Sequence, residues 1–205
     1  LGDRMVRGQL DVALAPAGEE QHARLVHWFT QAEPRPDRIF SSDLRRCRAL
    51  AEALARATGA PVAFEKALRE QSMGAWEGKT WSELTKIDGP AVTAYWDCYH
   101  EARPTGGESM EDLRARAVAW WERTEPTVTG KRVVLVTHIG VIRALACHFL
   151  GLPISEALRF APATASHTSL LLAEAGAVIS TFGERPWLTF DEGAESELDA
   201  SEETE

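Results

Sequence analysis

Residues 131–153, KRVVLVTHIGVIRALACHFLGLP, constrain the fold of this chain more than any other segment. The apolar and β-branched run at 132–137 is typical of a buried strand, and the apolar positions of 139–150 then recur at helical spacing. Gly151 closes that helical run. His138 therefore stands where a buried strand ends and a helix begins, and a polar imidazole at that point needs an explanation.

The remaining segments alternate between strand and helix signals. Strands are predicted at 36–42, 61–65, 167–173 and 177–182, and helical segments at 19–29, 41–59, 79–103 and 109–126. Ser42 or Asp43 is expected to cap the helix at 41–59 and Gly59 to end it, while Ser109 and Asp112 have capping-box spacing. Such alternation favours a parallel or mostly parallel sheet that is covered by helices on both faces.

The length and charge of the chain favour one domain and an acidic tail. A chain of 205 residues can bury one sizeable core, so residues 1–190 are expected to form a single domain. Residues 191–205 hold eight acidic residues and no basic one, and without them the chain has 23 acidic and 22 basic residues. We expect this tail to be disordered, and the near-neutral remainder gives no indication of a nucleic-acid partner.

The apolar runs and the cysteines of the sequence indicate the cellular compartment of the protein. No apolar run reaches the ~20 residues that span a bilayer, and the first ten residues lack the apolar core of a signal peptide. Three widely spaced cysteines, Cys47, Cys98 and Cys147, favour reduced thiols over disulfides or a zinc site. The sequence therefore predicts a cytoplasmic protein without a membrane partner.

Three side chains are expected along one edge of the predicted sheet. Ligands of parallel sheets bind beyond the carboxyl ends of the strands, where His138 and the turn at 41–46 lie. Each begins a helix, whose free N–H groups and dipole favour an anion. Arg46 alone resembles a solvated helix residue and Glu70 alone a loop acid, but their shared edge makes all three candidates for one anion site.

Five segments resemble, in the same order, motifs of the histidine phosphatase superfamily, which includes phosphoglycerate mutase and many small phosphatases. The segments are GQLDVALAPAGEEQHA (8–23), SSDLRRCRALAEAL (41–54), LREQSMGAWEG (68–78), PTGGES (104–109) and VVLVTHIGVIRAL (133–145). The resemblance covers about residues 4–182. It implies an α/β fold of the phosphoglycerate mutase type, a three-layer α/β/α sandwich with a mostly parallel central sheet.

The resemblance also implies a phosphomonoesterase that hydrolyses a small phosphorylated metabolite through a phosphohistidine intermediate. It places the second pocket arginine on Arg46, the catalytic acid on Glu70 and the second histidine on His138. Arg46 and His138 would bind the phosphoryl group, and Glu70 would protonate the leaving oxygen and then activate water. No metal or cofactor is expected, because arginine and imidazolium neutralise the phosphoryl charge.

One departure from the family pattern is large. The Arg-His-Gly that carries the nucleophilic histidine is absent from the 205 residues, and we expect it upstream of Leu1. Because that motif lies on an inner strand, we expect a strand-width gap, or a substitute strand, beside 132–137 on the side facing 167–173. We therefore expect these 205 residues to be a truncated form of a longer protein, which by itself binds phosphate poorly and hydrolyses nothing.

Two other functions stay open at this point. A phosphoglycerate mutase-type isomerase would share every pocket residue, although the short segment at 79–107 favours the compact phosphatase branch. A non-catalytic protein that binds a phospho-ligand would need no nucleophile.

Either a monomer or a homodimer is expected. Four aromatic residues should line the pocket or pack its lid (Trp76, Trp81, Tyr95 and Trp96). His22 and His27 are interpreted as structural or exposed, and His167 either is a polar residue at a strand end, which is favoured, or approaches the mouth of the pocket.

Overall fold

A three-stranded parallel sheet forms the centre of the computed structural model, which describes residues 4–31, 34–173 and 176–188. Its strands, in spatial order, are β2 (Val62–Phe64), β1 (Arg38–Ser41) and β3 (Val133–Val136). The central position of β1 places its carboxyl end between those of its two parallel neighbours. All three predicted strands are therefore present, each slightly shorter than its apolar run.

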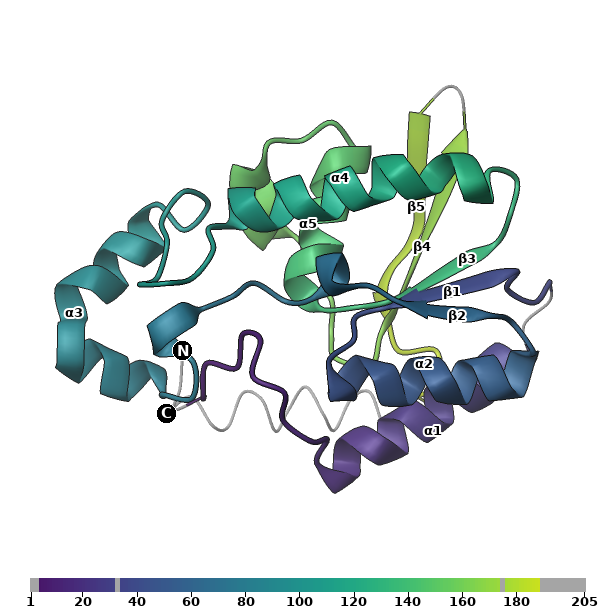
Figure 1. Ribbon diagram of the computed structural model, residues 1–205, viewed down its shortest axis with the longest axis horizontal. Helices are drawn as coiled ribbons and strands as arrows, with labels where there is room; N and C mark the ends of the chain where they lie inside the picture. The colour runs from purple at the N-terminus through teal and green to yellow at the C-terminus, as the bar shows by residue number, and fades with distance from the viewer. Residues whose placement is uncertain (1–3, 32–33, 174–175, 189–205) are drawn as a thin grey trace.

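Helices cover both faces of this sheet, as Figure 1 shows. One face carries α1 (Pro16–Gln31) and α2 (Arg45–Thr58), and the other carries α4 (Met110–Val128) and α5 (Ile139–Phe149). Neighbouring residues of β1 contact helices on opposite faces of the sheet. Ile39 packs with α1 and α2, whereas Phe40 packs edge-on against Trp120 of α4. The predicted three-layer α/β/α sandwich is thus confirmed.

The helix α3 (Trp81–Asp97) lies to one side of the sandwich and contains a kink at Asp88. A capping box formed by Thr80 and Glu83 begins it. Three short 3₁₀ turns complete the helical part of the fold: η1 (Lys66–Leu68), η2 (Gly74–Trp76) and η3 (Ile154–Arg159). The first two belong to the loop that carries Glu70.

The predicted cap of α2 is wrong, whereas the other two caps are confirmed. Leu44 occupies the N-cap position and has no capping side chain. Asp43 is paired with Arg69, and the Ser42 hydroxyl, which contacts Nε2 of His138, accepts from the N–H of Leu44 at 3.3 Å rather than from an N–H of the first helical turn. Gly59 ends α2 in the left-handed conformation (φ 78°), and the capping box of Ser109 and Asp112 begins α4.

The last two strands form a separate antiparallel pair. β4 (His167–Ala173) pairs with β5 (Gly176–Glu184). Among the described ranges, β3 is hydrogen-bonded to β1 alone and β4 to β5 alone. The expected lack of pairing between 132–137 and 167–173 is therefore found, and the parallel prediction holds for the first three strands only.

The described ranges test two further expectations, one about membrane-spanning helices and one about the state of the cysteines. They include no helix that is both long enough and apolar enough to cross a membrane. Cys47 and Cys147 are buried free thiols, and Cys98 is a partly exposed one. The acidic tail at 191–205 lies outside the described residues.

Candidate active site

Arg46 lies in the first turn of α2 and points back across the carboxyl end of the sheet. Its Nη1 and Nη2 donate to the carbonyls of Leu10 and Gly8, each at 2.7 Å, and its Nε donates to Nδ1 of His138 at 3.3 Å. A guanidinium has five N–H donors in a rigid fork. Arg46 therefore holds the segment around residues 8–10 in place and keeps two donors for a ligand.

His138 is the N-cap residue of α5 and lies directly after β3. Its ring is buried, with Nε2 at 2.9 Å from Oγ of Ser42 and 3.4 Å from Sγ of Cys47. Because arginine can only donate, Nδ1 must accept the bond from Arg46, and we assign the ring proton to Nε2. Burial and the positive charges of Arg46 and Arg116 lower the pKa of His138 to about 3, so the imidazole is neutral near pH 7.

Glu70 reaches the same place from the loop that follows β2. Its Oε1 accepts from the N–H of Gln71 at 2.9 Å, and its Oε2 accepts from the N–H of Gly140, in the first turn of α5, at 3.3 Å. Loss of surrounding water raises the pKa of Glu70, against the opposing effect of these two N–H groups and of Arg46 and Arg116. A carboxyl group with a raised pKa can hold a proton for donation.

Gly140 is required by this approach of Glu70 to α5. A Cβ atom at position 140 would lie 2.2 Å from Oε1 of Glu70 and 3.1 Å from Cδ1 of Leu113. Any side chain there would displace the carboxylate. The structure therefore brings Arg46, Glu70 and His138 together at the carboxyl edge of the sheet, as the sequence predicts.

A pair of residues that the sequence did not single out holds the Glu70 loop. Arg116 of α4 donates to the carbonyls of Ala67 at 2.7 Å and Glu70 at 2.9 Å. The same guanidinium pairs with Glu108 at 2.8 Å, and Glu108 accepts from the N–H of Ser72 at 2.9 Å. Glu108 belongs to the PTGGES segment, whereas Arg116 stands in an ordinary helical pattern and has no local signal.

Backbone contacts join the two glycine-containing segments into one unit. The N–H of Ala75 donates to the carbonyl of Thr105 at 2.9 Å, and the N–H of Glu108 donates to the carbonyl of Ser72 at 2.8 Å. Gly74 has a φ of +52°, and a Cβ there would lie 2.3 Å from the carbonyl oxygen of Thr105. The glycine therefore permits both the turn and the close approach.

The four aromatic residues noted in the sequence form one cluster beside this loop. Ring centroids lie 5.3 Å apart for Trp76 and Tyr95 and 5.2 Å apart for Trp81 and Trp96. The hydroxyl of Tyr95 donates to Oε1 of Gln71 at 3.3 Å. The cluster thus supports the residue next to Glu70 by packing.

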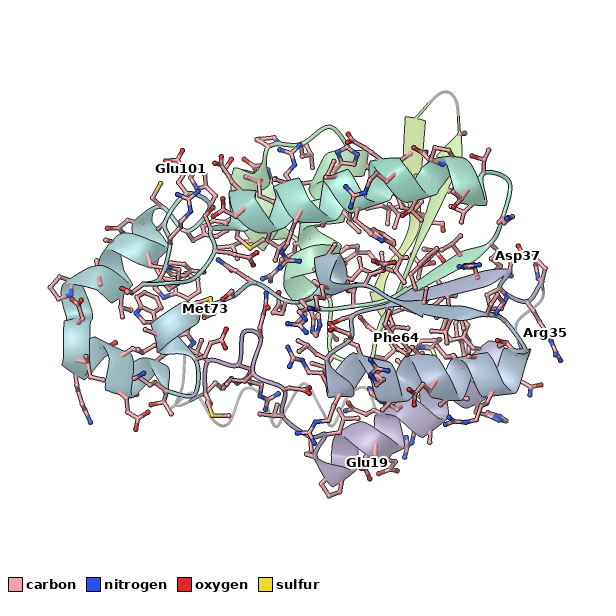
Figure 2. The ribbon with its side chains drawn as sticks, in the orientation of Figure 1. Glu19, Arg35, Asp37, Phe64, Met73 and Glu101 are labelled. Carbon is pink, nitrogen blue, oxygen red and sulfur yellow. The ribbon has the colours of Figure 1, made fainter. Side chains whose placement is uncertain are left out.

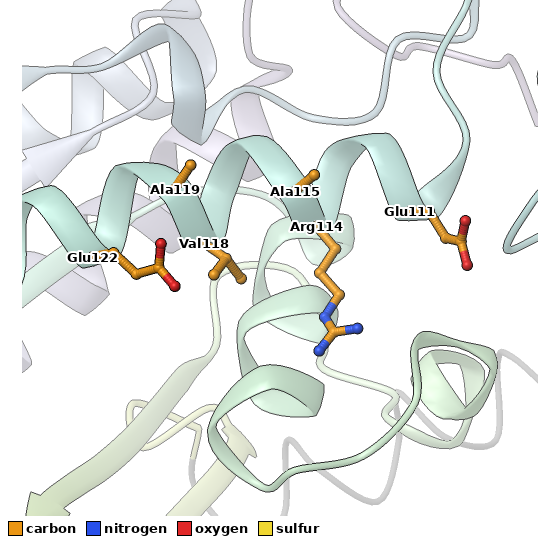
Figure 3. Close-up of a pocket in the computed structure, with 6 residues that line it drawn as sticks. All are labelled: Glu111, Arg114, Ala115, Val118, Ala119 and Glu122. Atoms are coloured by element: carbon orange, nitrogen blue, oxygen red, sulfur yellow. The ribbon is translucent and has the colours of Figure 1, made fainter.

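The remaining predicted positions lie outside the site. His167 packs against Trp28 and Phe29 of α1, with ring centroids 4.8 and 5.9 Å away, which agrees with a structural role. His22 and His27 are on α1 itself. Figure 3 shows a shallow hollow on the outer side of α4, lined by Glu111, Arg114, Ala115, Val118, Ala119 and Glu122. It contains none of the three site residues.

Comparison with known proteins places this geometry in a family. A glucosyl-3-phosphoglycerate phosphatase of Mycolicibacterium vanbaalenii is 37% identical over 162 residues, which cover 76% of this chain and 70% of that protein. A solved mycobacterial glucosyl-3-phosphoglycerate phosphatase is 31% identical with a TM-score of 0.74, over 87% of this chain and 91% of the other.

An α-ribazole phosphatase from Shigella flexneri shares the fold, with a TM-score of 0.81, 21% identity and coverage of 89% of this chain and 90% of the other. The family model of the histidine phosphatase superfamily (branch 1) matches residues 2–185. Motif order, site geometry and these matches agree with one another. The chain belongs to the histidine phosphatase superfamily.

Proposed function

We propose that this protein is a phosphomonoesterase that hydrolyses a small phosphorylated metabolite through a phosphohistidine intermediate. One domain, residues 1–190, would supply Arg46, Glu70 and His138 to the reaction. The reaction also needs a nucleophilic histidine, and the 205 residues contain no Arg-His-Gly segment. Similarity to the phosphatases named above supports the reaction class.

The observation that carries this proposal is the meeting of a donor pair and a protonatable acid. Arg46 has two unused N–H donors, and the N–H groups that begin α5 lie beside it. Together they can bind the equatorial oxygens of a phosphoryl group, which carry its negative charge. Glu70 lies at the same helix terminus, within reach of a leaving oxygen.

The proposed reaction has two steps. An imidazole nitrogen of the nucleophilic histidine attacks phosphorus, the bond between phosphorus and the leaving oxygen breaks, and the Glu70 carboxyl group gives its proton to that oxygen. The Glu70 carboxylate then takes a proton from water as the water attacks phosphorus, the bond between phosphorus and the imidazole nitrogen breaks, and inorganic phosphate is released with the histidine restored. Arg46, positioned by its bond to Nδ1 of His138, and the N–H groups at the start of α5 stabilise the charge in both steps.

The raised pKa of Glu70 suits both of its roles. A carboxyl group whose pKa lies above its usual value is protonated more readily, and it can act first as the acid and then as the base of the same cycle. The two backbone donors, from Gln71 and Gly140, stabilise the ionised form between the steps. The expected imidazolium at His138 is not part of this scheme, because burial and two arginines keep its imidazole neutral. No metal is required, because Arg46 and the helix terminus neutralise the phosphoryl charge.

We also propose a cytoplasmic location and a monomeric or homodimeric state. The three free cysteines support a reducing compartment. The substrate is assigned only as a phosphomonoester of a small metabolite. Glycerate-derived phosphates are the first compounds to try, given the names of the related phosphatases.

Brief incubation of the natural gene product with radiolabelled phosphomonoester, followed by alkaline quenching, tests the proposal. We expect acid-labile, alkali-stable label on a histidine and release of inorganic phosphate in the same sample. Interconversion of 2- and 3-phosphoglycerate without phosphate release would instead identify a mutase. Phosphate binding without any covalent label would identify a non-catalytic binding protein.

A further inference from the structure

Three potential metal ligands meet at the far end of α3, in the turn that follows Asp97. The side-chain atoms of Cys98, His100 and Glu101 that can bind a metal all lie within 4.8 Å of one another. Sγ of Cys98 is 3.7 Å from Oε2 of Glu101, and Nε2 of His100 is 3.7 Å from Oε1 of the same carboxylate. Glu101 thus lies between a thiol and an imidazole.

These separations suit a small tetrahedral site. Zinc binds sulfur at about 2.3 Å and nitrogen or oxygen at about 2.0–2.2 Å, so neighbouring ligand atoms of a tetrahedral centre lie roughly 3.5 Å apart. Each of the two 3.7 Å separations is close to that value, although one is measured to Oε2 of Glu101 and the other to Oε1. With one ligand atom from each residue, all three atoms lie within 4.8 Å of one another, so binding requires them to move closer together by about 1 Å.

The backbone of the turn is held independently of any metal. The N–H groups of Glu101 and Ala102 donate to the carbonyl of Cys98 at 3.0 and 2.8 Å, and the N–H of Glu111 donates to the carbonyl of His100 at 3.1 Å. The last bond ties the turn to the start of α4. The ligand-bearing residues are therefore placed before binding, which reduces the entropy cost of capturing an ion.

The site is open to solvent. The side chain of Glu101 is 64% exposed and that of His100 27% exposed, and Cys98 is the partly exposed member of the three cysteines. Figure 2 shows Glu101 at the outer surface, well away from the sheet edge that carries the candidate active site. An ion can therefore enter without rearrangement of the core.

We propose that Cys98, His100 and Glu101 form a binding site for a divalent zinc-type metal ion, with water in the fourth position. A thiolate with an imidazole selects zinc, cobalt or a similar ion over magnesium and calcium, which require oxygen ligands. The wide spacing of the three cysteines in the sequence disfavours a zinc site. The turn instead collects one cysteine and one histidine with an acid.

Titration of the 205-residue chain with Co²⁺ under reducing conditions tests the site. A thiolate bound to Co²⁺ gives a charge-transfer band in the near ultraviolet, and d–d bands in the visible report tetrahedral geometry. We expect both, and we expect stoichiometric Zn²⁺ to remove them. The Cys98→Ser variant should lose the near-ultraviolet band completely.

Two further variants and one control complete the experiment. His100→Ala and Glu101→Gln should each weaken Co²⁺ binding by at least the ~10-fold that even outer-shell changes cost. His27→Ala, which removes an exposed imidazole of α1, should bind as the unchanged chain does. No charge-transfer band at millimolar Co²⁺, or the same band in Cys98→Ser, would overturn the proposal.

Discussion

The candidate active site combines two regions that are held in different ways. Arg46 and His138 stand at the starts of α2 and α5, where regular strands end and helices begin. Glu70 instead lies in a loop between β2 and α3. The first region is placed by the backbone ladder of the parallel sheet, and the second by side chains that come from distant parts of the chain.

The difference is visible in the partners of each region. β1 and β3 pair in register from Arg38 with Val133 to Ser41 with Val136, so the two following turns are fixed side by side. Around Glu70, the bonds come from Arg116 and from Gly140, 46 and 70 residues away in sequence. Rigid elements therefore supply the phosphoryl-binding side, whereas a clamped loop supplies the acid.

The largest effect is expected from Glu70→Gln in the natural gene product. The amide oxygen can accept only one of the two backbone bonds, from Gln71 or from Gly140, and the amide cannot donate a proton as a carboxylic acid does. Turnover of alkyl phosphates should fall by ~10²–10⁴-fold, the usual contribution of a general acid. Turnover of p-nitrophenyl phosphate should fall much less, because its leaving group needs little protonation. Equal losses for both substrates would remove Glu70 from the acid role.

On the sheet side, Arg46→Lys should lower kcat/KM by ~10²–10³-fold, because a single ammonium cannot replace the fork of donors. Arg48→Lys, two residues further along α2 and paired with Glu52 at 3.6 Å, is the matched control and should stay near the unchanged activity. Similar losses in both variants would show that α2 as a whole, rather than Arg46, matters.

Arg46 also offers a test that needs no turnover. Its positive charge helps to lower the pKa of His138, after the larger effect of burial. Arg46→Ala should therefore raise the pKa of His138 in an NMR titration of the 205-residue chain. An unchanged titration would mean that burial and Arg116 keep this imidazole neutral without Arg46.

Arg116→Gln addresses the loop side and should have an intermediate effect. Loss of its bonds to Ala67, Glu70 and Glu108 frees the loop, and misplacement of a catalytic group by about 1 Å can cost up to ~10²-fold in rate. Removing its charge also lets the pKa of Glu70 rise further, so the protonated acid persists to higher pH. The alkaline limb of the kcat/KM profile should move upward in pH, which simple unfolding would not produce.

The smallest effect is expected at the start of α4. Ser109→Ala removes one half of the capping box and should reduce the free energy of unfolding by about 1 kcal/mol. The bonds from Arg103 and Ser109 hold the pKa of Asp112 below its usual range. The stabilisation that the ionised Asp112 carboxylate provides is therefore complete above pH ~4 and is lost as Asp112 protonates at lower pH. Thermal unfolding at neutral and at acid pH measures the loss of stability and its pH dependence. Thr80→Ala, in the similar capping box of α3, is the control.

Local patterns were sufficient to predict most elements of the fold. The run at 132–137, the helix at 139–150 and the capping box of Ser109 and Asp112 all follow from the period of apolar residues and from terminal residue types. The cap of α2 was not predictable, because Ser42 and Asp43 are recruited by His138 and Arg69 from other segments. A local rule fails where a distant partner competes for the same side chain.

By itself, the sequence determined the alternation of strands and helices, the strand–His138–helix unit and the edge to which Arg46 and His138 belong. Parallel strands fix that edge, since every carboxyl end must face the same way. Only the tertiary structure decided the tautomer and low pKa of His138, the clamp of Arg116 and Glu108 on the Glu70 loop, and the meeting of Cys98, His100 and Glu101. Those features depend on distances of a few ångströms and on desolvation, which arise only once the chain has packed.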